Sequence, residues 1–109
     1  MRIIPFKDFS SFDMEITLDD IPLIVKFNWN SRGEFWVMSF YDRDGVSLVV
    51  GIKIVINQEL LTQFVDKGLP PGEMYAIREN ESHDRLTQNE FINNEAFLVY
   101  ATEATIASI

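Results

Sequence analysis

Three sets of residues in this chain have types and spacings that could support chemistry, and the first is Asp-Arg-Asp-Gly at residues 42–45. Two acids one residue apart resemble the start of a calcium loop, in which carboxylate oxygens hold the ion. An EF-hand also needs a third acid, a glutamate at the twelfth position and a helix on each side. Because residues 42–45 lack the third acid and stand between two expected strands, we interpret them as a hairpin turn.

The single histidine, His83, is the second candidate, because Asp84 beside it could orient the imidazole as a general base. No nucleophile accompanies it: the chain has no cysteine, and no serine stands in a G-x-S-x-G motif. We therefore interpret His83 as a solvent-exposed loop residue. An enzymatic function would require a pocket that joins His83 to a carboxylate at hydrogen-bonding distance.

Groups of carboxylates form the third set, and each group falls in an expected turn or loop. They are Asp19 with Asp20, Asp42 with Asp44, and Glu79 with Glu81 and Asp84. Glycoside hydrolysis needs two carboxylates across a cleft, one of them buried so that its pKa rises. Solvated turn carboxylates do not meet this requirement, and the five scattered glycines form no phosphate-binding loop. The sequence therefore predicts no enzyme: no catalytic residue, no metal ligand and no cofactor.

Composition narrows the class of protein further. The 109 residues are enough for one domain, and 47% of them are hydrophobic, as in a globular protein. A net charge of −8, with no cluster of Lys or Arg, disfavours binding to nucleic acid. The absence of cysteine excludes disulfides and Cys-based zinc sites. No signal peptide or membrane-spanning segment is apparent, so we expect no membrane association.

The elements that carry these residues are mostly β-strands, because apolar and polar residues alternate along much of the chain. Strands are predicted at residues 12–18, 21–28, 34–41, 46–56, 73–79 and 95–101. Asp19 and Asp20 suit a tight turn between the first two strands. The sequences NSRG at 30–33 and DRDG at 42–45 each suit a type I turn followed by a left-handed glycine.

Two further signals complete the expected fold. Gly51 indicates a bulge in the long strand 46–56, whose even-numbered apolar residues from Val46 to Ile56 we place on one face. A short helix is predicted between Asn57, a plausible N-cap, and Gly68, with loop 80–90 further on. The predicted fold class is mainly β, a small antiparallel meander or partly open β-barrel of about six to seven strands with one short helix. It forms a single β-barrel-like domain over 1–101, and 102–109 is expected to be a mobile tail.

The strand at 34–41 has large apolar side chains on both faces. Its even face of Trp36, Met38 and Phe40 is predicted to be core, because the lone polar residue, Ser39, is on the odd face. The odd face also carries Phe35, Val37 and Tyr41, which would expose several hundred Å² if bare, at about 150–250 Å² per aromatic side chain. Three explanations stay open: cover by loop 80–90 or the tail, a protein partner, or a small ligand. We take these three residues as a candidate partner interface.

A family resemblance runs through the same residues. The run FDMEITLDDIPLIVKFNWNSRGEFWVMSFYDRDGVSLVVGIKIV, followed by ELL and LPPGEMYAI, resembles the baseplate plug proteins of contractile-tailed bacteriophages, a small family named from a cyanophage. The residues that carry the resemblance are Leu18, Asp19, Trp29, Asn30, Gly33, Phe35, Trp36, Tyr41, Asp42, Asp44, Gly45, Leu48, Val49, Gly51, Ile52 and Leu69 to Glu73. It covers residues 10 to 100. The polar segment 80–94 and the tail from Thr102 depart from the usual pattern.

The resemblance implies a non-enzymatic structural protein of the virion, without a cofactor. It would lie in the tail baseplate, plug or initiate the tail tube at the hub, and be assembled in the host cytoplasm. Its implied partners are other baseplate, hub and tail-tube proteins and further copies of itself, with no nucleic acid and no membrane. The alternative from the residues is a small ligand- or carbohydrate-binding β-barrel, with Trp29 and Tyr41 as stacking platforms.

Overall fold

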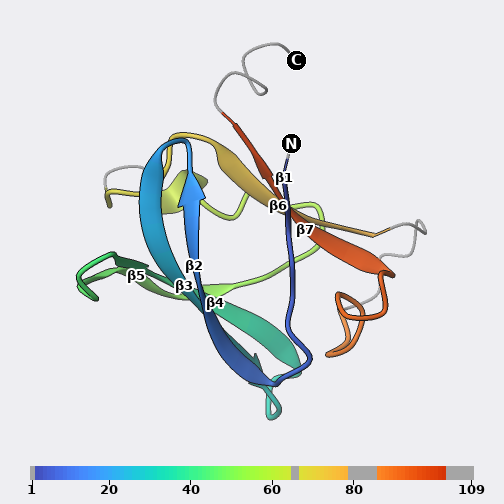
Figure 1. Ribbon diagram of the computed structural model, residues 1–109. Coiled ribbons are helices and arrows are strands. Elements are labelled where there is room, and N and C mark those ends of the chain that lie inside the picture. Colours follow the sequence, from blue (N-terminus) through green and yellow to red (C-terminus); the bar gives the residue numbers. More distant parts are fainter. Residues whose placement is uncertain (1, 65–66, 79–85, 103–109) are drawn as a thin grey trace.

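The computed structural model describes residues 2–64, 67–78 and 86–102, which form the two antiparallel sheets of Figure 1. The four-stranded sheet has the order β2-β3-β4-β5, and the three-stranded sheet has the order β1-β7-β6. The strands are β1 Arg2–Ile4, β2 Ser11–Leu18, β3 Ile21–Asn30, β4 Phe35–Asp42, β5 Ser47–Lys53, β6 Glu73–Arg78 and β7 Ala96–Ala101. The predicted mainly β, antiparallel fold of six to seven strands is confirmed, and within the described residues the sheets do not close into a barrel.

The β2–β3 hairpin forms as the sequence predicts. The two strands pair without interruption from Ser11 opposite Asn28 to Leu18 opposite Ile21. Asp19 and Asp20 between them have φ angles of 48° and 65°, the left-handed conformation that a two-residue hairpin turn requires and that Asp tolerates.

The other two hairpin turns differ from each other, although NSRG and DRDG follow the same residue pattern. In the turn 42–45, the N–H groups of Asp44 and Val46 donate to Asp42 Oδ1, and Gly45 has a φ of 85°, as predicted. In the turn after β3 the left-handed residue is Glu34, with a φ of 59°, so the prediction for Gly33 is wrong. The backbone carbonyl of Asn30 accepts the N–H of Glu34 at 2.7 Å, whereas that of Asp42 accepts the N–H of Gly45. The turn after β3 is therefore one residue longer.

The predicted bulge at Gly51 is present and has a consequence that the sequence pattern did not indicate. Gly51 has a φ of 86°, and the β4–β5 register shifts beside it. Because a bulge adds one residue, the alternation of β5 reverses there. Val46 and Val50, predicted on the buried face, are 60% and 64% exposed, whereas Ile52 is buried. The regular strand ends at Lys53 rather than at 56.

The helix predicted between Asn57 and Gly68 is a single 3₁₀ turn, Thr62–Phe64. Asn57 is not an N-cap, since its φ is 60°. The backbone N–H groups of Asn57, Leu60 and Leu61 donate to Ala76 O, Met74 O and Glu73 Oε1, respectively. These hydrogen bonds hold residues 57–61 against β6 in a non-helical conformation. Residues 65 and 66 of this prediction lie outside the described residues.

The core lies between the two sheets and contains an aromatic cluster. The even face of β4 is buried as predicted, with Trp36, Met38 and Phe40 at most 1% exposed. Phe6 lies at the centre of the cluster, where its ring stacks on Phe91 at 4.3 Å and meets Trp36 edge-on at 5.1 Å. The cluster therefore joins β4 to the segment before β2 and to the segment before β7.

Tyr100, 1% exposed, ties the two sheets together at the other end of the core. Its hydroxyl oxygen accepts the N–H of Gly72 at 2.8 Å, and its O–H donates to Asp19 Oδ2 at 2.5 Å. An added Cβ on Gly72 would overlap the Ala101 carbonyl oxygen and this hydroxyl. The close approach of these two backbone segments therefore requires glycine at position 72.

Replacing Tyr100 by Phe should reduce the free energy of unfolding by about 2 kcal/mol, because a buried N–H and a carboxylate both lose their hydrogen-bond partner. Urea unfolding followed by circular dichroism measures the change. Tyr75→Phe is the matched control, since Tyr75 is only half-buried. Equal losses in the two variants would show that the hydroxyl bridge does not contribute to stability.

Side chains from the N-terminal segment occupy the free edge of β2. Arg2 Nη1 donates to the Thr17 carbonyl oxygen at 2.8 Å, and Lys7 Nζ donates to the Asp13 carbonyl oxygen at 3.0 Å. Two carbonyl groups that another strand could use are thereby already hydrogen-bonded.

Candidate functional site

The outward-facing sides of the two sheets are the candidate functional surfaces, and they differ in chemistry. On the four-stranded sheet, the outward residues of β2 are all polar: Ser11, Asp13, Glu15 and Thr17. On the three-stranded sheet, two neighbouring outward pairs of β6 and β7 are apolar: Tyr75 with Val99, and Ile77 with Phe97. A solvated sheet normally has one polar face, so the second surface is the unusual one.

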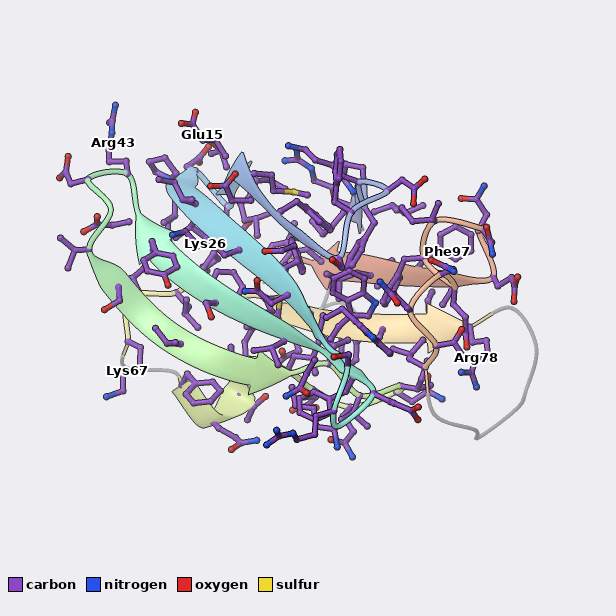
Figure 2. All side chains as sticks on the ribbon, turned by 90° about the horizontal axis from the view of Figure 1, so that it is seen from below. Glu15, Lys26, Arg43, Lys67, Arg78 and Phe97 are labelled. Carbon is purple, nitrogen blue, oxygen red and sulfur yellow. The ribbon has the colours of Figure 1, made fainter. Side chains whose placement is uncertain are left out.

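The three residues predicted as a partner interface do share one outward face. Phe35, Val37 and Tyr41 are each half-buried on β4. Lysine side chains from the neighbouring strands partly cover them: Lys26 Nζ lies 4.7 Å from the Tyr41 ring centroid, and Lys53 Nζ lies 4.8 Å from that of Phe35. We define these five residues as the four-stranded face, and Figure 2 labels Lys26 on the four-stranded sheet.

Residues 86–90, the described part of loop 80–90, do not cover Phe35, Val37 and Tyr41. Gln88 accepts a hydrogen bond from Trp36 Nε1 at 3.3 Å, and Trp36 is on the opposite, buried side of β4. Residues 79–85 and 103–109, which include the rest of the loop and the predicted mobile tail, lie outside the described residues. Docking of a partner on Phe35, Val37 and Tyr41 stays a prediction.

A second apolar surface, which was not predicted from the sequence, lies on the three-stranded sheet. Val99 in the central strand is opposite Ile3 on one side and Tyr75 on the other, and Phe97 is opposite Ile77. We define these five residues as the three-stranded face. Ile3 is 59% exposed, Ile77 is 38% exposed and Val99 is only 4% exposed. None of the five side chains is charged.

The sequence contained a signal for this face. The segments MYAI and FLVY are apolar at every position, as strands with two covered faces are. The same argument that singled out residues 34–41 applies to both segments. Strand β1 escaped prediction because three residues are too few to show an alternation.

A groove of about 440 Å³ adjoins the three-stranded face at Tyr75. Its apolar walls include Leu61, Phe64, Leu69, Pro70 and Pro71. Its polar lining includes Glu59 and Glu73, and the Thr62 hydroxyl lies within hydrogen-bonding distance of both carboxylates.

Carboxylates and burial set the electrostatics of this groove. Glu73 is 6% exposed, and its Oε1 accepts the N–H groups of Leu61 at 2.6 Å and Met74 at 2.8 Å. Burial raises the pKa of the Tyr75 phenol, and the nearby Glu59 and Glu73 carboxylates raise it further. The phenol is therefore neutral at physiological pH, and the groove carries negative charge from glutamate.

The structure places two of the three groups of carboxylates that the sequence offered for chemistry. The Asp42 carboxylate holds its own turn, and Asp19 binds the Tyr100 hydroxyl. His83, with Glu79, Glu81 and Asp84, lies outside the described residues. Among the described residues, no three His, Asp or Glu side chains gather as ligands for a metal ion. The described part of the chain also contains no helix with the length and hydrophobicity to cross a membrane.

Trp29 and Tyr41, expected as stacking platforms for a ligand, point to opposite sides of the four-stranded sheet. Trp29 packs edge-on against the buried Trp36 at 5.7 Å, whereas Tyr41 lies on the outward face under Lys26. They cannot form one binding site, so the ligand-binding alternative loses the residue pair on which it depended.

A protein-family model described as cyanophage baseplate Pam3 plug gp18 matches residues 1–103. No curated protein matches the chain. The matched region contains all seven strands and both outward faces.

Proposed function

Because the chain belongs to the cyanophage baseplate plug family, we propose that it is a non-enzymatic protein that plugs or initiates the tail tube at the baseplate hub. A structural role in the baseplate of a phage tail follows from the family itself, as the resemblance of residues 10 to 100 led us to expect. The observation that carries the more specific proposal is the same match, because it extends over nearly the whole chain and its description names a plug.

The structure supports a role in assembly through the three-stranded face. The largest apolar patch on a typical monomer covers about 300–600 Å² and is often functional. In the three-stranded face, Ile3, Tyr75, Ile77 and Phe97 surround the buried Val99, beside a groove lined by Glu59 and Glu73. The partners we propose are hub and tail-tube proteins together with further copies of this chain, assembled in the host cytoplasm into the virion. Neither nucleic acid nor a membrane is among them.

The carboxylates also support a non-enzymatic role. Asp42 is engaged by two backbone N–H groups, and Glu73 is engaged by two others. Glu90 forms an ion pair with Arg78. Each of these acids stabilises a turn or a contact between elements, and structural use of this kind accounts for its position.

Ile77→Glu should allow the protein to fold yet prevent its incorporation into tails, since a charge then lies in the three-stranded face. Phage particles that lack the gene would be complemented from a plasmid with the wild-type chain, Ile77→Glu or the control Val46→Glu. Val46 is an equally apolar, 60% exposed residue away from that face. Electron microscopy and mass spectrometry of purified tails would measure tube formation and incorporation.

We expect normal tails with the wild-type chain and the Val46 variant, and at least a tenfold loss of tails with the Ile77 variant. Normal, infectious tails in particles that lack the gene altogether would refute the proposed function. Normal tails with Ile77→Glu would refute only the role of the three-stranded face.

A further inference from the structure

The two outward faces are on opposite sides of the molecule, because the sheets pack through their inner faces. Both faces are apolar over part of their area, and the charges beside them are opposite. The four-stranded face carries Lys26 and Lys53, and the groove beside the three-stranded face carries Glu59 and Glu73. One face therefore has the chemistry that complements the other.

We propose that the four-stranded face of one copy docks on the three-stranded face of the next copy, head to tail. The inference rests on the proposed function and names one of its partners, a second copy of this chain. A contact between two different faces is heterologous, and with little rotation between neighbouring copies it adds copies in one direction as an open stack. The two half-apolar surfaces of one chain thereby cover each other.

The charges agree with a nearly translational arrangement of neighbouring copies. Within one chain, β5 leads into the segment that bridges to β6 at Ile56 and Ala76, so the β5 side and the β6 side of the molecule coincide. Lys53 is on β5, and Glu73 is at the start of β6. Stacking copies with little rotation therefore brings Lys53 of one copy toward the exposed Glu59 of the next, whereas Glu73 is buried. The acidic residues of β2, Asp13 and Glu15, lie at the opposite edge of the four-stranded sheet.

The size of the contact indicates a weak interaction. Two strands of six residues and one of three, at about 3.3 Å per residue and about 4.8 Å between strands, give a face of roughly 240 Å². A standard stable interface buries about 800 Å² per partner. The pairing is therefore expected to need a high local concentration, such as a baseplate provides when other proteins hold several copies together.

The absence of cysteine permits a direct test by cross-linking. Val50, 64% exposed on β5 beside the four-stranded face, and Ile77 of the three-stranded face are each replaced by Cys in separate full-length proteins. The variants are oxidised alone and as an equimolar mixture at millimolar concentration, where a weak contact is populated. Ser31→Cys, in the exposed turn after β3, controls for random collision.

We expect the Val50 and Ile77 variants to form a mixed disulfide at least tenfold faster than either forms with the Ser31 variant or with itself. Lys53→Glu should reduce this rate several-fold, Glu59→Lys should do the same, and the two changes placed on opposite partners should restore it. Arg43→Glu, in the 42–45 turn, should have no effect.

Faster coupling of either variant with itself would overturn the head-to-tail pairing in favour of a symmetric contact. A mixed rate no greater than that of the Ser31 control would overturn pairing between copies altogether. Either result leaves the proposed function intact, because incorporation into tails is measured independently. Only the complementation of particles that lack the gene tests whether this chain is required for tail formation.

Discussion

Replacing Glu90 by Gln is expected to lower the free energy of unfolding by about 3 kcal/mol, since it removes one partner of a buried, bidentate ion pair. The Arg78 and Glu90 side chains are 4% and 10% exposed. Their contact is bidentate: Arg78 Nε donates to Glu90 Oε2 at 2.9 Å, and Nη2 donates to Oε1 at 3.0 Å. Glu90 Oε1 also accepts the Thr87 N–H at 3.0 Å. Urea unfolding at pH 7 measures the loss.

The same ion pair predicts how stability depends on pH. Burial by itself raises the pKa of Glu90, but hydrogen bonds from Arg78 and Thr87 and the Arg78 charge outweigh burial and lower the pKa below its ordinary value of 4.5. A carboxyl group with a lowered pKa stabilises the fold fully above its unfolded-state pKa, and this stabilisation is lost as the pH falls through the folded-state value. The difference between wild type and Glu90→Gln should therefore shrink below about pH 4.5.

Glu95→Gln is the control for both measurements, because Glu95 is an exposed acid of the same segment. It should change the free energy of unfolding by less than about 0.5 kcal/mol at either pH. If Glu90→Gln unfolds at the same urea concentration as Glu95→Gln, the ion pair does not stabilise the fold. A difference that stays constant down to pH 3 would contradict the assigned pKa direction.

Trp36→Ala should destabilise the protein by about 3–5 kcal/mol, which is a large part of the total stability of a small domain. Trp36 is 1% exposed, and its ring contacts those of Phe6, Phe12 and Trp29. The substitution removes these contacts and leaves a cavity. Thermal unfolding followed by calorimetry measures the shift of the melting temperature.

Trp36→Phe separates packing from hydrogen bonding at the same position. It keeps an aromatic ring in the cluster but loses the indole N–H that donates to the Gln88 carbonyl. We expect it to destabilise the protein by about half as much as Trp36→Ala. Equal losses in both variants would show that the tie to Gln88, and not the ring cluster, dominates the contribution of Trp36.

Alternation along single strands was sufficient to predict much of the four-stranded sheet. In β4 the lone polar residue, Ser39, correctly marked the outward face and placed Trp36 in the core. In β5 the pattern failed because Gly51 adds a residue to the strand and reverses its two faces. The sequence indicated the bulge itself, but the exposure of Val50 depends on how the bulge shifts the register with β4, and Val46 precedes the strand.

Features that depend on pairing between distant segments could not be predicted. Residues 57–64 have the apolar spacing of a helix, yet their backbone N–H groups donate to β6, which follows later in the chain. The three-stranded face depends on Ile3 lying opposite Val99, a pairing across nearly the whole chain. Phe35, Val37 and Tyr41 were correctly grouped on one side of one strand, but their partial cover by Lys26 and Lys53 comes from neighbouring strands.

The hydrogen bonds from Arg2 and Lys7 to the edge of β2 affect how readily this edge can pair with another chain. Structural proteins of a particle accumulate to high concentration, and a free strand edge at high concentration is a template for fibrils. Arg2 and Lys7 already bind the Thr17 and Asp13 carbonyl groups along this edge, and each adds a positive charge beside it. A second β2 edge that approached would have to displace both side chains and bring like charges together. The N-terminal segment therefore disfavours pairing of another strand with the edge of β2.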